Sequence, residues 1–180
     1  MFLTPRIRWF WRTDSSANTD SRMTNIYVDG DACPVREEVY RVADRLNLHV
    51  FVVSNGSRPI RPRGTANVDF ITVSEGFDAA DDWIADRITP QDICVTADIP
   101  LASRCLAKRA RALTPHGKIW TEANIGNALA GRELSRHLRE LGIAGGGSAP
   151  FSKADRSRFL NALDTAVQAA LREYRDRTSA

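Results

Sequence analysis

The chain has 180 residues, which is enough for one domain with a substantial hydrophobic core. Its composition is ordinary for a soluble protein, and no apolar run reaches the length of a membrane-spanning helix. The formal net charge is +3; residues 1–22 carry four arginines and two aspartates, so the rest of the chain carries only +1. This balance excludes a strongly basic body and gives no independent support for nucleic-acid binding.

Residues 1–22 show no helical or strand period and no apolar signal-peptide core. We predict that they are either a disordered leader or an over-long start, with Met23 as the true initiator, and that residues 23–176 form one domain. The three cysteines are odd in number and include no Cys-x-x-Cys pair, a pattern typical of free thiols in a reducing cytoplasm. We therefore expect a cytoplasmic protein, with no membrane contact.

A short apolar run, residues 26–28, predicts a buried strand that ends at Asp29-Gly30-Asp31, and a helical pattern starts at Pro34. A second apolar run at residues 48–53 completes a βαβ unit with parallel strands. The two aspartates could simply make the turn and cap the helix. Because both follow a buried strand and flank a glycine, we favour a functional site.

The rest of the chain continues the alternation of strands and helices. Together these elements predict an α/β fold of three layers, with a mostly parallel central sheet and helices on both faces. Further strands are predicted at residues 68–73, 92–97 and 112–115, with a hairpin arm at 117–120. Further helices are predicted at residues 78–84, from residue 100, and at 121–129. After an interruption at Gly131, another helix runs to about residue 141, and the last helix begins after Ser152.

Asp98 follows the fourth predicted strand, so in a parallel sheet it should emerge at the same edge as Asp29 and Asp31. Asp78 and Asp81 share one face of a helix start with Asp82. These acids could serve only as helix caps and dipole partners, but they exceed what capping needs.

Clustered carboxylates repel one another and suit a hard divalent cation. We therefore predict that the acids at the two strand ends and on the acidic helix face form a Mg²⁺ or Mn²⁺ site, with phosphoryl transfer as its chemistry. The spacing does not select a nuclease over a phosphatase. The loop after the second strand offers Asn55, Ser57 and Arg58 as substrate-binding residues, with a solvated basic loop as the alternative.

Five short motifs are distinctive when they are taken together. They are Val28–Pro34 (VDGDACP), Ser54–Gly56 (SNG), Gly76–Asp81 (GFDAAD), Thr96–Ala102 (TADIPLA), and Gly145-Gly146 followed by Ser152-x-x-Asp155-Arg156. On these motifs the sequence closely resembles the YaiI/YqxD family of uncharacterised bacterial proteins, from about Asn25 to the end of the last predicted helix. Family members often have Ala where Gly30 stands and Asn where Asp82 stands, so the resemblance does not require a carboxylate at position 82.

The family is grouped with PIN-like domains, many of which are metal-dependent ribonucleases that use acids at strand ends. The resemblance thus implies a PIN-like fold, Asp29 as the first acid and Asp98 as the late acid. Asp31, Asp78 and Asp81 would be further ligands or would orient water. It also implies RNA as a candidate partner, and we take Asp29, Asp31 and Asp98 as the candidate catalytic residues. Fold likeness alone does not establish an activity.

Two other functions remain open at this stage. A haloacid-dehalogenase-like phosphatase would use Asp29 as nucleophile and Asp31 as general acid. That fold also needs a lysine before its late acidic motif, and no lysine lies between Asp31 and Asp98. The second alternative is a non-catalytic PIN-like module that binds RNA or a protein. The sequence does not determine the oligomeric state.

Overall fold

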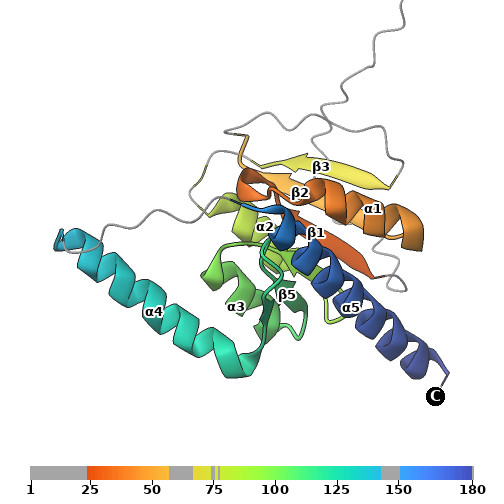
Figure 1. Ribbon diagram of the computed structural model, residues 1–180. Helices are drawn as coiled ribbons and strands as arrows, with labels where there is room; N and C mark the ends of the chain where they lie inside the picture. Colours follow the sequence, from red (N-terminus) through yellow and green to blue (C-terminus); the bar gives the residue numbers. More distant parts are fainter. Residues whose placement is uncertain (1–23, 57–66, 74–75, 77, 143–150, 180) are drawn as a thin grey trace, which may run out of the picture.

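A central sheet of six strands organises the computed structural model, which describes residues 24–56, 67–73, 76, 78–142 and 151–179 (Figure 1). The strand order is β3-β2-β1-β4-β5-β6; β1 to β5 are parallel, and β6 is antiparallel to β5. The elements in chain order are β1 (Asn25–Asp29), the 3-10 helix η1 (Gly30–Ala32), α1 (Arg36–Leu46), β2 (His49–Ser54), β3 (Val68–Thr72), α2 (Ala79–Arg87), β4 (Ile93–Val95), α3 (Ile99–Ala107), β5 (Arg111–Leu113), β6 (Ile119–Trp120), α4 (Glu122–Glu140) and α5 (Lys153–Thr178).

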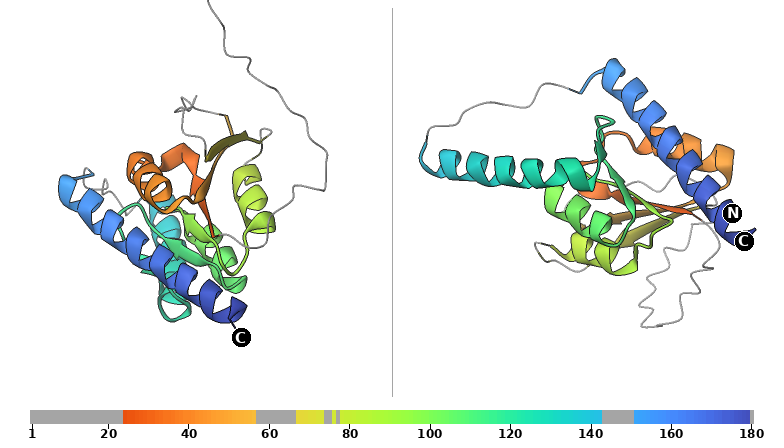
Figure 2. Two further views of the ribbon diagram at one scale, coloured as in Figure 1. Left: turned by 90° about the vertical axis from the view of Figure 1, so that its right-hand side faces the viewer. Right: turned by 90° about the horizontal axis from the view of Figure 1, so that it is seen from below.

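Helices cover both faces of the sheet, so the expected three-layer α/β architecture of PIN-like type is confirmed (Figure 2). Ile26 and Val28 of β1 pack with α1 and α5, whereas Tyr27 between them packs with α2 and α3. This alternation follows from the period of two in a strand. Both faces of the central strands are buried, which explains why they read as almost continuous apolar runs.

The helix starts carry the expected capping residues. Asp98 caps α3 by accepting a hydrogen bond from the Leu101 backbone N–H at 2.9 Å. Ser152 and Asp155 form a reciprocal capping box at the start of α5. At the other end of α1, Asn47 adopts a left-handed conformation with φ of 51°.

The predicted break at Gly131 is wrong, because α4 is one continuous helix of 19 residues. A glycine inside a helix costs only about 0.5–1 kcal/mol, which neighbouring interactions can offset. Arg136 pairs with both Glu133 and Glu140 one turn away on each side. Figure 2 shows that α4 projects away from the sheet. In the described ranges, no helix combines the length and apolar character needed to cross a membrane.

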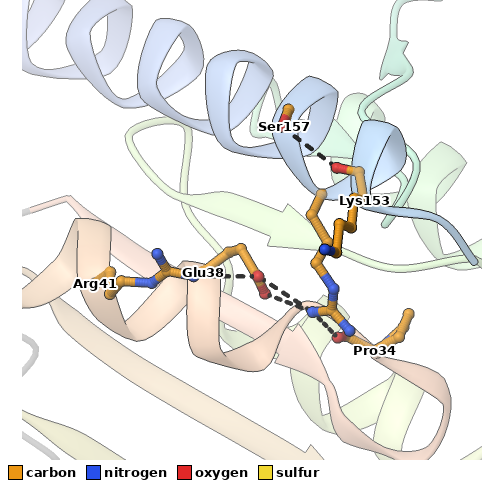
Figure 3. Close-up of polar contacts among 6 residues, drawn as sticks. Pro34, Glu38, Arg41, Lys153 and Ser157 are labelled. Atoms are coloured by element: carbon orange, nitrogen blue, oxygen red, sulfur yellow. Dashed lines mark hydrogen bonds and ion pairs between the residues drawn. The ribbon is translucent and has the colours of Figure 1, made fainter.

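An ion pair between the buried Glu38 and the half-exposed Arg156 joins the start of α1 to α5 (Figure 3). The Glu38 side chain is 4% exposed, and Arg156 Nη1 donates to its two carboxylate oxygens at 3.1 and 3.2 Å. The same nitrogen donates to the carbonyl oxygen of Pro34 at 3.1 Å. Arg41 contacts Glu38 from within α1 at 3.3 Å. These contacts hold the segment that directly follows the Asp29-Gly30-Asp31 turn.

Candidate active site at the carboxyl edge of the sheet

The ends of β1 and β4 are joined through the hydroxyl of Thr96. The two strands pair in parallel with Val28 opposite Val95, which places Asp29 beside Thr96. Thr96 Oγ1 donates a hydrogen bond to Asp29 Oδ2 at 2.9 Å and accepts one from the Asp98 backbone N–H at 2.9 Å. The predicted meeting of the first and late acids at one sheet edge is therefore present, and Thr96 fixes their relative position.

Asp31 connects the site to the end of a third strand, β2. The Asn55 backbone N–H donates to Asp31 Oδ2 at 3.1 Å. The other carboxylate oxygen, Oδ1, is buried and has no hydrogen-bond partner within the described residues. A buried carboxylate oxygen in this state calls for a water molecule or a cation, because its desolvation is otherwise uncompensated.

Near the start of α2, Asp81 lies at the site, whereas Asp82 pairs with a residue of α3. Asp81 is half-buried, and burial raises its pKa from 3.8 to about 6, with the nearby charges of Asp98, Asp29 and Asp78 adding to the rise. Asp82 instead pairs with Arg104 on α3 at 2.8 Å. Asp81 therefore faces the strand-end acids, whereas Asp82 belongs to a surface ion pair between two helices.

Burial also raises the pKa of Asp29, an effect that its hydrogen bonds from Thr96 and the Asp31 backbone oppose. The charges of Asp31 and Asp98 raise it further. Asp29 and Asp81 are thus both disfavoured as anions by burial and by their acidic neighbours. Charge repulsion of this kind is relieved by a bound cation.

Two arginines lie at the rim of the site, and no pattern in the sequence singles out either of them. Arg132 on α4 places Nη2 3.6 Å from Asp98 Oδ2. Arg104 on α3 lowers the pKa of Asp81 by its charge while it pairs with Asp82. Both contacts join different helices, so no local pattern reveals them. Thr96 could have been noticed, because it stands two residues before Asp98 in the Thr96–Ala102 motif.

The predicted substrate-binding residues are only partly described. Asn55 lies at the site and uses its backbone N–H to hold Asp31. Ser57 and Arg58 lie outside the described residues. The assignment of all three to substrate binding stays a prediction.

The donor set fits a hard cation that takes few protein ligands. Across residues 24–56, 67–73, 76, 78–142 and 151–179, no three His, Cys, Asp or Glu side chains are close enough together to form a metal cage. Mg²⁺ characteristically retains several waters and binds through one or two carboxylates together with substrate phosphates. The Asp31 oxygen that has no partner within the described residues and the repulsion around Asp29 are consistent with such a partial site. The five-residue ligand set stays a prediction.

Cys33 does not have the properties of a nucleophile. Its side chain is buried, with 6% exposed, and burial raises the thiol pKa to about 12. The thiolate is therefore scarce at neutral pH, and the nearby helix start does not offset the burial. Cys94 and Cys105 are fully buried in the core.

Comparison with known proteins gives the chain's relatives. The profile of the uncharacterised YaiI/YqxD family matches residues 27–169. The chain belongs to this family. It is similar to a UPF0178 protein of Paramagnetospirillum magneticum, with 57% identity over 150 residues, covering 83% of this chain and 98% of the relative.

A second UPF0178 protein, from Rhodospirillum centenum, is 53% identical over 154 residues, covering 83% of this chain and 99% of the relative. No solved structure matches the chain. The family resemblance read from the motifs is confirmed. Because the family is described as uncharacterised, membership does not assign a reaction.

Proposed function

We propose that this YaiI/YqxD protein is a Mg²⁺- or Mn²⁺-dependent phosphodiesterase that cleaves RNA at the carboxyl edge of its sheet. The observation that carries the proposal is the meeting of Asp29 and Asp98 at the ends of two neighbouring parallel strands, where the Thr96 hydroxyl joins them. Asp81 of α2 lies near enough for the charges of both to add to the rise in its pKa that burial causes. Carboxylates gathered at strand ends in this way are suited to holding a cation and a phosphate together.

Each residue of the site has a role that follows from its contacts. Asp29 is the central ligand candidate, and Thr96 fixes its carboxylate by donating to Oδ2. Asp31 has one oxygen held by the Asn55 N–H, and the other has no partner among the described residues, so Oδ1 is the atom that we assign to a cation or to its bound water. Asp81 and Asp98 complete the acidic rim. When bound, the divalent ion would neutralise phosphate charge and activate water for attack.

Arg132 at the rim of the site is suited to the substrate. Arg132 lies 3.6 Å from Asp98, beyond good hydrogen-bond distance, so its guanidinium can reach a phosphate oxygen without breaking a tight ion pair. Its position on α4 would let a phosphodiester chain run from the acids along the helix. We expect Arg132→Ala to raise KM for RNA more than it lowers kcat, because backbone contacts contribute mainly uniform binding.

The test is cleavage of an end-labelled single-stranded RNA with Mn²⁺, Mg²⁺ or EDTA. We expect internal cleavage by the wild type with either ion, and its loss with EDTA and in Asp29→Asn and Asp98→Asn. Asp82→Asn is the matched control, since Asp82 pairs with Arg104 and should leave cleavage intact. Full activity in Asp29→Asn would remove this residue from the mechanism.

Two further measurements separate the alternatives. Cation binding is followed independently of activity, as the rise in melting temperature with Mn²⁺, which should shrink in Asp29→Asn and persist in Asp82→Asn. A monoester, p-nitrophenyl phosphate, is assayed beside the diester bis-p-nitrophenyl phosphate. Turnover of the monoester alone would favour a phosphatase. Mn²⁺ binding without turnover of any substrate would favour a binding module.

A further inference from the structure

Helix α4 passes beside the acidic site and continues beyond it. Its first turns pack on the core next to α3 through Ile125, which is 8% exposed, and Leu129. One turn later, Arg132 reaches Asp98, the acid that follows β4. Figure 1 shows that α4 then extends to the left, past the edge of the sheet at which the parallel strands end. The second half of α4 therefore flanks the path of a chain that leaves the site on this side.

The side of α4 that packs on the core continues as a row of arginines. Steps of three or four residues lead from Ile125 and Leu129 to Arg132, Arg136 and Arg139, which we call the α4 arginine row. All three arginines are exposed. Because Arg132 contacts the acidic site, the row lies on the side of the helix that faces this site. Apolar residues thus cover this side where the helix is packed, and arginines cover it where the helix is free of the core.

Two members of the α4 arginine row have no tight carboxylate partner. Arg136 is held on its own helix by Glu133 and Glu140. Among the described residues, Arg139 has no ion-pair partner, and Arg132 has only its 3.6 Å contact with the site. A guanidinium without a bound carboxylate keeps its N–H donors for another anion, and its planar fork matches phosphate oxygens. Phosphates of a bound chain are therefore the ligands that complement this row.

The spacing of the row indicates how long such a chain must be. Arg132 and Arg139 are seven residues apart, which is about 10.5 Å along a helix. This separation exceeds the distance between adjacent phosphates on one strand. A chain that keeps one phosphate at the acids and another at Arg139 must therefore contain several consecutive nucleotides. A single row of charges on one helix also matches one backbone, whereas a duplex presents two.

We propose that the α4 arginine row binds the backbone of a single-stranded RNA, so that the substrate class is an oligonucleotide or longer RNA and not a mononucleotide or dinucleotide. This inference rests on the proposed phosphodiesterase function of the same site. Arg132 binds a phosphate next to the acids, and Arg139 binds one several nucleotides away. Contacts to phosphates carry no sequence information, so the row gives little preference among bases. The low net charge of the chain agrees with this assignment, because the arginines are gathered on one side of one helix.

The first test measures binding without turnover. Fluorescence anisotropy of a labelled RNA of about 12 nucleotides is recorded in EDTA at several salt concentrations, which gives the slope of log Kd against log salt. Each phosphate contact on a single strand contributes about 0.7 to this slope. We expect Arg139→Ala to lower the slope by about 0.7 and to raise Kd about 3- to 5-fold, and Arg139→Lys to keep the slope because it keeps the charge. An unchanged slope in Arg139→Ala, or no RNA binding by the wild type, would overturn the proposal.

Arg175→Ala is the matched control. Arg175 lies in the last turn of α5, near Glu173, which pairs with Arg111 at the start of β5. It is therefore at the opposite edge of the sheet from the acids (Figure 1). Both variants change the net charge equally and place a good helix former in a helix, so they should fold alike. Arg175→Ala should bind RNA like the wild type, and equal weakening in both variants would mean general charge attraction and overturn the proposal.

A length series separates the α4 arginine row from the chemistry at the acids. With Mn²⁺, kcat/KM is measured for a dinucleotide, a hexanucleotide and a dodecanucleotide. We expect the wild type to gain at least about 5-fold from the shortest to the longest chain, mainly through a lower KM, and Arg139→Ala to lose most of this gain. Equal kcat/KM at all lengths would refute the role of the row and leave the phosphodiesterase function standing. No cleavage at any length, with RNA binding in EDTA that depends on Arg139, would refute the catalytic function and retain the row as an RNA-binding surface.

Discussion

Asp81 is the residue whose replacement tests the electrostatics of the site most directly. Its pKa rises from 3.8 to about 6 in the folded protein, first because it is buried and then because Asp98, Asp29 and Asp78 are negatively charged. A raised carboxyl pKa means that the ionised form destabilises the fold. The contribution of Asp81 to the free energy of unfolding is therefore favourable at low pH, where the carboxyl group is protonated. This contribution is lost as pH rises from about 4 to about 6.

The size of the effect follows from the shift. A difference of about 2 pKa units corresponds to about 3 kcal/mol, and the half-exposed position of Asp81 reduces this by screening to about 1–1.5 kcal/mol. Asp81→Asn removes the charge and keeps the shape. We expect the variant to be more stable than the wild type by this amount at pH 7.5, with the gain shrinking toward zero near pH 4.

The assay is urea denaturation in EDTA, repeated between pH 4 and pH 8, with the unfolding free energies of variant and wild type subtracted at each pH. Subtraction cancels the contributions of other titrating groups. Asp82→Asn is the control, because Asp82 is exposed and paired with Arg104, and it should show no pH-dependent gain. A destabilised Asp81→Asn at pH 7.5, or a gain independent of pH, would refute the idea that acidic repulsion strains this site. In a parallel series with Mn²⁺ in place of EDTA, the gain should be smaller, because a cation relieves the repulsion in the wild type.

Three further predictions concern the supports of the site and the fold. Thr96→Val should cost about 1–2 kcal/mol in urea denaturation, more at pH 7.5 than at pH 4.5 because Asp29 loses the hydrogen bond that lowers its pKa; Thr96→Ser should restore most of the loss. Arg156→Ala should cost about 2 kcal/mol, because it leaves buried Glu38 without its interhelical partner, whereas Arg41→Ala should cost much less; equal losses would contradict this assignment. Gly117→Ala should lower the free energy of unfolding by about 2–3 kcal/mol in thermal melts, because φ at Gly117 is +83° and a Cβ would lie 2.7 Å from the Arg158 carbonyl carbon. Gly131→Ala is the control: it has open space around it and should be neutral or stabilising.

The sequence by itself determined the alternation of strands and helices and the placement of the strand-end acids. Buried parallel strands must be apolar on both faces, so residues 26–28 and 48–53 were recognisable as strands without structural information. Parallel strands also end at one edge, so Asp29 and Asp98 had to emerge on the same side of the sheet. These conclusions depend only on local patterns and on chain direction.

The tertiary structure decided how those acids are held and what surrounds them. Thr96 joins Asp29 to Asp98, and the Asn55 N–H holds Asp31, through contacts between segments that are distant in sequence. The approach of Arg132 to Asp98 depends on how α4 packs beside α3. The continuity of α4 through Gly131 was likewise invisible locally, because the cost of one glycine is smaller than the stabilisation that the rest of the helix can supply. Side-chain chemistry fixed which groups could form a site, and packing fixed which of them meet.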